Sequence, residues 1–234
     1  MNKKKRNLWD IPDSELTTEQ RIEKLMEDMI ANPEFKDDCL ERMFNAYYDG
    51  EQYENAIRAI GQAIQCATEP HPDYYGCLSM AYKKLGDLPN AITAKQKQIE
   101  LSPFEPYNYF EMGRLYVETG DFTKAVENFV SMLAFPLKFG QLTSADWFFE
   151  CMSSFYTENY DNEFEDEMDP EALNTFQMLL KAATTKTQQA YMHCVLSRFY
   201  LYYEKETEAQ KEAKKAYRLL PDEIRRSGFT APPP

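Results

Sequence analysis

The sequence has few of the residues that catalytic and metal sites are usually built from. Its 234 residues include two histidines, five cysteines and eight glycines. It contains no HExxH string, no CxxC pair, no glycine-rich phosphate loop and no nucleophile elbow. These absences argue against an enzyme, so we expect no catalytic residue, no metal site and no cofactor.

Other absences restrict the location of the protein and its classes of ligand. No apolar run approaches the roughly 20 residues that span a bilayer, and no apolar segment follows the basic start MNKKKR as it would in a signal peptide. The cysteines are scattered and odd in number, which is typical of free thiols in a reducing compartment. A net charge of −13 disfavours binding to nucleic acid or to an anionic membrane surface. We therefore expect an acidic, cytoplasmic protein.

The sequence does contain one helical-hairpin pattern written twice in succession. The two copies are LSMAYKKLGDLPNAI (residues 78–92) and MGRLYVETGDFTKAV (residues 112–126). Matching residues stand 34 positions apart: Tyr82 and Tyr116, Gly86 and Gly120, Asp87 and Asp121, Ala91 and Ala125. A period of this length, made of two amphipathic helices, is typical of stacked helical repeats.

The pattern resembles the tetratricopeptide repeat (TPR) family. One copy reads Tyr75-x2-Leu78-Ser79-x2-Tyr82, then Ala91-x3-Lys95, and the next reads Tyr109-x2-Met112-Gly113-x2-Tyr116, then Ala125-x3-Phe129. Weaker copies occur around Leu40, Phe148 and His193, which makes five in all. The resemblance implies an all-α fold, a TPR α-solenoid of antiparallel helix hairpins.

We predict four segments along the chain. Residues 1–16 are a disordered basic N-terminus, residues 17–35 an N-terminal helix and link, residues 36–223 the five TPR-like repeats, and residues 224–234 a C-terminal tail. In the first repeat the turn Asp49-Gly50-Glu51 is shifted by one residue relative to the later copies.

The fourth repeat is irregular, because an acidic loop at residues 158–169 separates its two predicted helices. The second of these helices is predicted around residues 172–180. Alternating Asp and Glu are typical of a solvated charged segment. The alternative interpretations are calcium binding, although the spacing lacks the central glycine and the closing glutamate of an EF-hand loop, and attraction of a basic partner.

In the TPR family, the first helices of the repeats line a concave groove. Carried over by repeat position, the predicted groove residues are Tyr107, Phe110, Arg114, Phe149, Tyr156, Tyr191, Arg198 and Tyr202. Tyr and Arg are residue types that anchor protein partners, although packing between repeats is the alternative role for some of these rings. The family's clamp for chaperone C-termini is not expected, since only Asn45 fits and Glu41 and Glu111 stand where cations are needed.

The expected function is a non-enzymatic protein–protein interaction scaffold or adaptor that binds a peptide segment in the concave groove. The alternative is a structural protein that forms homo-oligomers through its solenoid ends or through the groove. This alternative stays open because only a short tail is available to cover the last hairpin.

Overall fold

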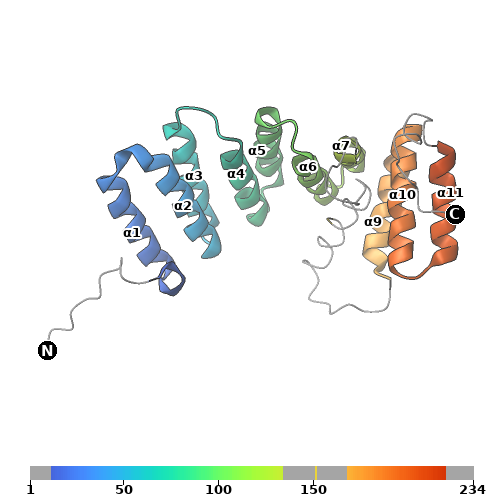
Figure 1. Ribbon diagram of the computed structural model, residues 1–234, viewed down its shortest axis with the longest axis horizontal. Coiled ribbons are helices and arrows are strands. Elements are labelled where there is room, and N and C mark those ends of the chain that lie inside the picture. Colours follow the sequence, from blue (N-terminus) through green and yellow to red (C-terminus); the bar gives the residue numbers. More distant parts are fainter. Residues whose placement is uncertain (1–11, 134–150, 152–167, 220–234) are drawn as a thin grey trace. The chain divides into compact units, whose positions relative to one another are not determined.

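The computed structural model describes residues 12–133, 151 and 168–219, and every regular element in these ranges is helical (Figure 1). The predicted all-α fold is confirmed. The chain divides into two compact units, Met1–Phe104 (unit 1) and Glu105–Pro234 (unit 2). Residues 1–11 of the predicted disordered N-terminus, the C-terminal tail, and all but the last two residues of the acidic loop lie outside the described residues. The prediction that disorder extends to residue 16 is wrong, because Asp13–Glu15 form a 3-10 helix and Leu16 is buried.

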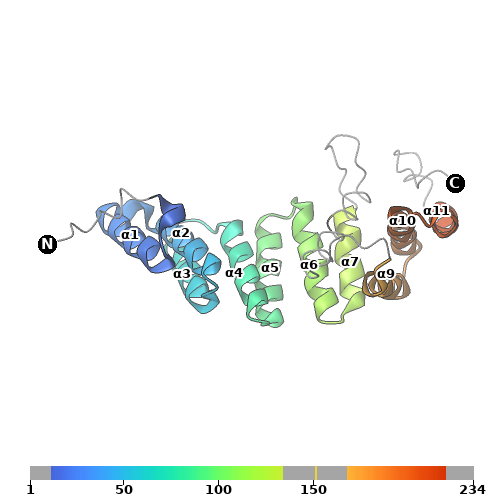
Figure 2. The ribbon, with the colours of Figure 1, turned by 90° about the horizontal axis from the view of Figure 1, so that it is seen from below.

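Unit 1 is a series of antiparallel helices packed against their neighbours in the sequence (Figure 2). Its helices are α1 (Thr18–Ala31), α2 (Lys36–Asp49), α3 (Tyr53–Cys66), α4 (Pro72–Lys84) and α5 (Leu88–Leu101), with short 3-10 helices η2 (Asp13–Glu15) and η3 (Pro33–Phe35). Helices α2 and α3 form one hairpin, and α4 and α5 form the next. Helix α1 covers α2, and its Ile22 and Leu25 join a core that includes Leu40, Phe44 and Ile60.

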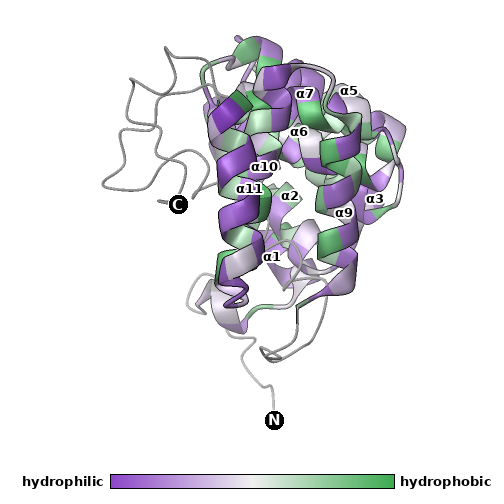
Figure 3. Cartoon of the chain, turned by 90° about the vertical axis from the view of Figure 1, so that its right-hand side faces the viewer, coloured by the Kyte–Doolittle hydropathy of each residue, from purple (hydrophilic) through white to green (hydrophobic). Residues whose placement is uncertain are grey.

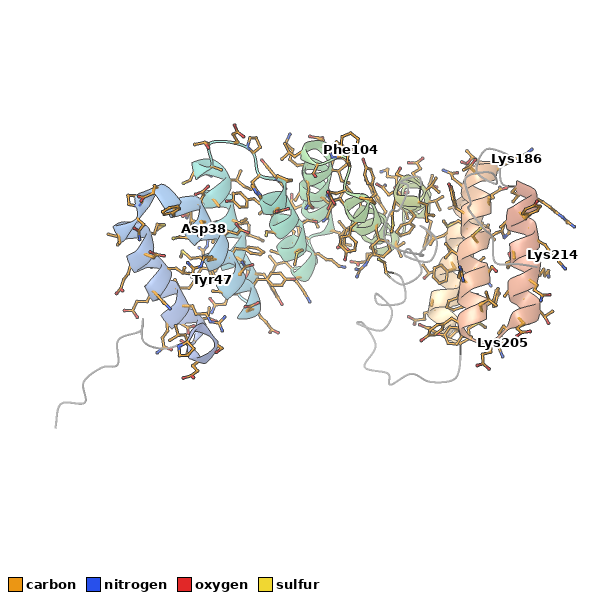
Figure 4. The ribbon with its side chains drawn as sticks, in the orientation of Figure 1. Asp38, Tyr47, Phe104, Lys186, Lys205 and Lys214 are labelled. Carbon is orange, nitrogen blue, oxygen red and sulfur yellow. The ribbon has the colours of Figure 1, made fainter. Side chains whose placement is uncertain are left out.

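The described residues of unit 2 form two complete hairpins and one further helix. They are α6 (Pro106–Glu118) with α7 (Phe122–Leu133), α10 (Lys186–Tyr202) with α11 (Glu206–Leu219), and α9 (Pro170–Ala182), which packs against α7 and α10. One core joins them all, from Phe110 on α6 to Ala216 on α11. Hydrophilic and hydrophobic bands alternate along α11 in Figure 3, and Lys214 points away from α10 in Figure 4. The apolar face of α11 therefore covers α10, and its charged face is exposed.

The helix starts follow local sequence signals. Thr17 and Thr185 each form a capping box, in which the threonine side chain accepts from the backbone N–H of a glutamine three residues later. Proline occupies the first turn of α4, α5, α6 and α9, where its missing N–H has no helical partner to lose. Asp169, at the end of the acidic loop, caps α9 by accepting two backbone hydrogen bonds.

Small residues let the two helices of a hairpin approach closely. Ser79 donates a hydrogen bond to the carbonyl of Ala91 at 2.9 Å, and Ser197 donates one to the carbonyl of Ala209 at 2.8 Å. In the α6–α7 hairpin, Gly113 stands at the position of these serines. There a Cβ would lie 2.3 Å from Cε1 of Phe129, so the glycine leaves space that the ring of Phe129 fills.

The four described hairpin turns share one backbone conformation. In each, two successive N–H groups bond to carbonyls three and five residues earlier, as in a Schellman motif; the first donors are Glu51, Gly86, Gly120 and Glu204. All four have positive φ, at 56°, 74°, 77° and 55° respectively. The predicted one-residue shift of the first turn is wrong, because Glu51 and not Gly50 takes the left-handed position. The hydrogen-bonding pattern places the left-handed residue at position 51, as in the other three turns. The glycine of this turn lies one residue earlier in the sequence, at position 50.

Replacing Glu51 or Glu204 by glycine is expected to stabilise the protein by about 1 kcal/mol each, since left-handed backbone is costly for residues with a Cβ. Thermal and urea unfolding would measure the gain. The matched control is Glu23→Gly in α1, where the same exchange removes a good helix former and is expected to cost about 1 kcal/mol. A loss of stability in both turn variants would contradict the proposed backbone strain.

Candidate functional site

On α6, the predicted groove residues divide between surface and core. The side chain of Tyr107 is 47% exposed, whereas Phe110 is 1% exposed and belongs to the core of unit 2. The ring of Phe110 lies 5.8 Å from that of Phe129 on α7. The expectation that Phe110 faces solvent is therefore wrong, because its position on α6 points toward the partner helix of the hairpin.

The remaining residues form a compact group that we call the α6 face: Tyr107, Glu111 and Arg114, with Phe110 beneath them. Nη1 of Arg114 donates a 2.9 Å hydrogen bond to Oε1 of Glu111, and the Arg114 side chain is 12% exposed. The guanidinium carbon lies 5.7 Å from the centre of the Phe110 ring, and the rings of Tyr107 and Phe110 are 5.8 Å apart. Packing and charge thus hold Arg114 in one place before any ligand arrives.

The hydroxyl of Tyr107 lies in an environment that favours its neutral form. Partial burial is the main cause that raises the pKa of Tyr107 to about 12, and the negative charge of Glu111 adds to it. The nearby Arg114 acts in the opposite direction and only partly offsets these effects. At neutral pH, Tyr107 is therefore a neutral phenol that is 47% exposed and whose hydroxyl is hydrogen-bonded to Glu111.

On α10, the predicted residues also lie at different depths. Tyr191 is buried at 6% exposure and packs in the core, so the expectation that it faces solvent is wrong. Arg198 is half-buried, whereas Tyr202, one turn further along, is 45% exposed. The predicted Phe149 and Tyr156 lie outside the described residues.

The exposed ring of Tyr202 rests on a chain of aromatic contacts that reaches the core. Ring centres are 5.0 Å apart between Tyr202 and Tyr203, 5.1 Å between Tyr203 and Phe199, and 5.1 Å between Phe199 and Phe176. We call the end of this chain, with the partly exposed Leu201 and Arg198, the α10 face. Like Tyr107, Tyr202 has an exposed ring that packs against a neighbouring, less exposed aromatic side chain.

Sequence reasoning missed the parts played by Glu111 and Tyr203. Glu111 follows Tyr107 by four residues and precedes Arg114 by three, which is the spacing of neighbours on one helix face. That spacing was available as a signal for Glu111. Tyr203 follows Phe199 by four residues, so the same kind of signal was present, and the structure places Tyr203 at the C-cap of α10.

One buried ionic group links the two helices of the last hairpin. Nδ1 of His193 donates to Oε2 of Glu212 at 2.6 Å, and Nζ of Lys215 donates to Oε1 of the same carboxylate at 2.7 Å. Burial lowers the pKa of His193 below 6.5, and the opposing effect of Glu212 is smaller. The neighbouring thiol of Cys194 is also buried, which raises its pKa to about 12 and keeps it protonated.

The lowered pKa of His193 predicts a pH dependence of stability. The unfolded chain takes up a proton near pH 6.5 while folded His193 still resists protonation. The contribution of neutral His193 to the free energy of unfolding is therefore complete above pH 6.5, and it falls as the pH drops toward the lower pKa of the folded state. Unfolding temperatures of the wild type and of His193→Gln, compared at pH 7.5 and 5.5, should show the steeper decline in the wild type. Parallel declines would contradict the assignment.

The described residues contain no group of three His, Cys, Asp or Glu side chains arranged to hold a metal ion. All five cysteines, each within the described ranges, are free thiols. Among the helices described, none combines the length and apolarity needed to cross a bilayer. The α6 and α10 faces carry aromatic, cationic and hydrogen-bonding side chains.

Residues 106–130, which form α6 and most of α7, match a sequence family model described as a tetratricopeptide repeat. No curated protein sequence matches the chain. Among solved structures, a tetratricopeptide repeat protein from Parabacteroides merdae is similar with a TM-score of 0.50 at 13% identity, over 94% of this chain and 93% of that one.

Two other solved structures cover similar shares. MamA has a TM-score of 0.47 at 16% identity, over 91% of this chain and 92% of its own. BtubC from P. vanneervenii has a TM-score of 0.46 at 12% identity, over 93% of this chain and 92% of its own. The repeat spacing, the matched repeat and the helix hairpins described above identify the fold of this chain as a tetratricopeptide-repeat α-solenoid of antiparallel helix hairpins.

Proposed function

We propose that the chain is a non-enzymatic scaffold that holds a peptide segment of a protein partner along the first helices of its repeats. The fold supports this proposal, since stacked helical hairpins offer extended binding surfaces rather than enclosed catalytic sites. The partner contacts are assigned to the α6 face and the α10 face.

The observation that carries the proposal is the arrangement of Tyr107 over a fixed base. Its half-exposed ring lies beside the Phe110 ring, and the Glu111–Arg114 pair at its side is largely buried. An aromatic ring that is already held in place loses little conformational entropy when a partner packs on it. Tyr and Arg in such surroundings are the residue types that dominate interface energies.

The α10 face would supply a second contact of the same kind. Tyr202 is as exposed as Tyr107 and is supported by Tyr203 and Phe199. Arg198 precedes Tyr202 by one helical turn, so a peptide that packs on the ring can place a carboxylate or carbonyl near the guanidinium.

Replacing Tyr107 by alanine is expected to weaken partner binding by about 2 kcal/mol, or roughly thirtyfold. The measurement is an affinity pull-down from native lysate with wild type and variant side by side, followed by titration of the captured partner. The matched control is Tyr217→Ala, a tyrosine on α11 that is 57% exposed and lies outside the predicted groove positions. Equal loss of the partner in both variants, or in neither, would contradict the assignment to the α6 face.

Self-assembly is the second candidate, favoured by exposed apolar side chains on the first helices of unit 1. Ile30 is 81% exposed at the end of α1, and Met26 and Phe35 are exposed nearby. A tagged chain that retains an untagged copy of itself, and loses it on Met26→Gln and Ile30→Gln substitution, would support this alternative. Light scattering that shows a monomer throughout the micromolar range would exclude it.

A further inference from the structure

Unit 1 contains a pocket of about 280 Å³ between α1, α2 and η2, and none of the eight predicted groove residues is part of its lining. Its floor is apolar and consists of the buried Leu25 and Ala46. Its polar lining consists of Ser14, Arg21, Lys24, Arg42, Asn45 and Asp49. The pocket thus gathers three cationic side chains against one carboxylate, in a chain whose net charge is −13.

The two ion pairs at the pocket show how these side chains are distributed. Nη1 of Arg21 lies 3.5 Å from Oδ2 of Asp49, and Nη1 of Arg42 lies 3.8 Å from Oδ2 of Asp28, which is outside the lining. Because α1 and α2 are antiparallel, these pairs mark the two ends of the pocket. Lys24 of α1 and Asn45 of α2 fall between them.

Both ion pairs are long compared with a charge-assisted hydrogen bond of about 2.7–2.9 Å. A guanidinium carries five N–H donors, which exceed what one carboxylate at such a distance can use. Arg42 can therefore turn toward an entering anion without breaking a short, well-formed salt bridge to Asp28.

We propose that this pocket binds a phosphate monoester group. Its cations come from both helices, and the amide of Asn45 and the hydroxyl of Ser14 add neutral donors. A phosphate monoester presents three oxygens around a tetrahedral centre and carries a charge of about −1.5 to −2 at neutral pH, so it can bond to donors on several sides at once. A carboxylate has two coplanar oxygens and one charge, and it matches only one arginine fork.

The size of the pocket indicates that the phosphate arrives attached to a small organic group. Its volume of about 280 Å³ is several times the roughly 30 Å³ that a water molecule occupies in the liquid. The apolar floor of Leu25 and Ala46 can contact the carbon atoms of that group. A phosphorylated serine side chain and a free small phosphate monoester both have this chemistry. The inference does not depend on the α6 and α10 faces.

The test is calorimetric titration of the full chain with acetyl-Gly-phosphoSer-Gly-amide and, separately, with inorganic phosphate. The matching serine and glutamate peptides serve as uncharged and carboxylate controls. We expect binding of the phosphorylated peptide, at least tenfold weaker binding of the glutamate peptide, and none of the serine peptide. Binding of glycerol 3-phosphate is measured beside them: tighter binding of the phosphopeptide would identify a modified protein as the source, and tighter binding of glycerol 3-phosphate would identify a small molecule. Tighter binding of inorganic phosphate than of both would overturn the contact of an organic group with Leu25 and Ala46.

Three variants locate the site. Arg42→Gln should weaken phosphopeptide binding at least tenfold, whereas Arg58→Gln, which removes the same charge from the exposed face of α3, should leave it unchanged. Asp49→Asn should strengthen binding about threefold, because it removes the carboxylate that competes for Arg21. A misfolded protein cannot produce this gain.

Equal losses in the Arg42 and Arg58 variants, equal affinity for the glutamate peptide, or no binding at millimolar concentration would each overturn the proposal.

Discussion

Replacing Phe199 by alanine is expected to destabilise the protein by about 3–5 kcal/mol, the range found for deleting a buried aromatic ring. Phe199 is 3% exposed and lies on α10, where its ring contacts Phe176 of α9 and both Tyr200 and Tyr203 of its own helix. The substitution leaves a cavity between α9 and α10 that rigid helices cannot close. Urea unfolding followed by circular dichroism would measure the loss.

The matched control for Phe199 is Tyr202→Ala, three residues along the same helix. Tyr202 is 45% exposed, so its removal creates no enclosed cavity and is expected to cost less than about 1 kcal/mol. The two variants also separate stability from binding, since only Tyr202 belongs to the proposed partner contacts. A small effect of Phe199→Ala, similar to that of Tyr202→Ala, would mean that α9 and α10 are not held together by this ring.

Replacing Gly113 by alanine is the second substitution with a large expected effect, a loss of about 1–3 kcal/mol from overpacking. The new Cβ would stand 2.3 Å from Cε1 and 2.5 Å from Cδ1 of Phe129, whose ring is fully buried. The ring or one of the two helices must move, and the core around Phe110 must move with it. Thermal unfolding would detect the change.

Two further variants test this explanation of Gly113. Gly61→Ala, within α3, meets no atom within 4 Å and is expected to stabilise by about 0.5–1 kcal/mol through helix propensity alone. Combining Gly113→Ala with Phe129→Leu should lose less stability than the two single changes together, since the smaller side chain gives the methyl group room. Strict additivity in the double variant would contradict a clash with Phe129.

The helices could be predicted well from the sequence because their signals are local. An N-terminal helix and link were predicted at residues 17–35, and the structure has α1 at Thr18–Ala31. In the irregular fourth repeat, apolar spacing predicted a helix around residues 172–180, where α9 spans Pro170–Ala182. Caps, proline positions and periodicity all act within one or two helical turns, so a single sequence contains them.

The depth of each side chain could not be predicted in the same way. Repeat position correctly assigned Tyr107 and Phe110 to one helix, but it did not show that one ring faces solvent and the other faces Phe129. That difference depends on the space that Gly113 opens against α7, which is a contact between residues 16 positions apart. The same reason applies to Tyr191 and Tyr202 on α10, whose exposure depends on how the neighbouring helices pack.

The left-handed glutamates in two of the hairpin turns have a practical consequence for mutagenesis. Natural proteins stand only slightly above the stability that they need, so substitutions that remove a binding residue often reduce the amount of folded protein as well. A chain that carries glycine at residues 51 and 204 should gain about 2 kcal/mol in all, because the turns are far apart in sequence and share no partner. In that background, a variant such as Tyr107→Ala can lose its partner while its folded population stays constant.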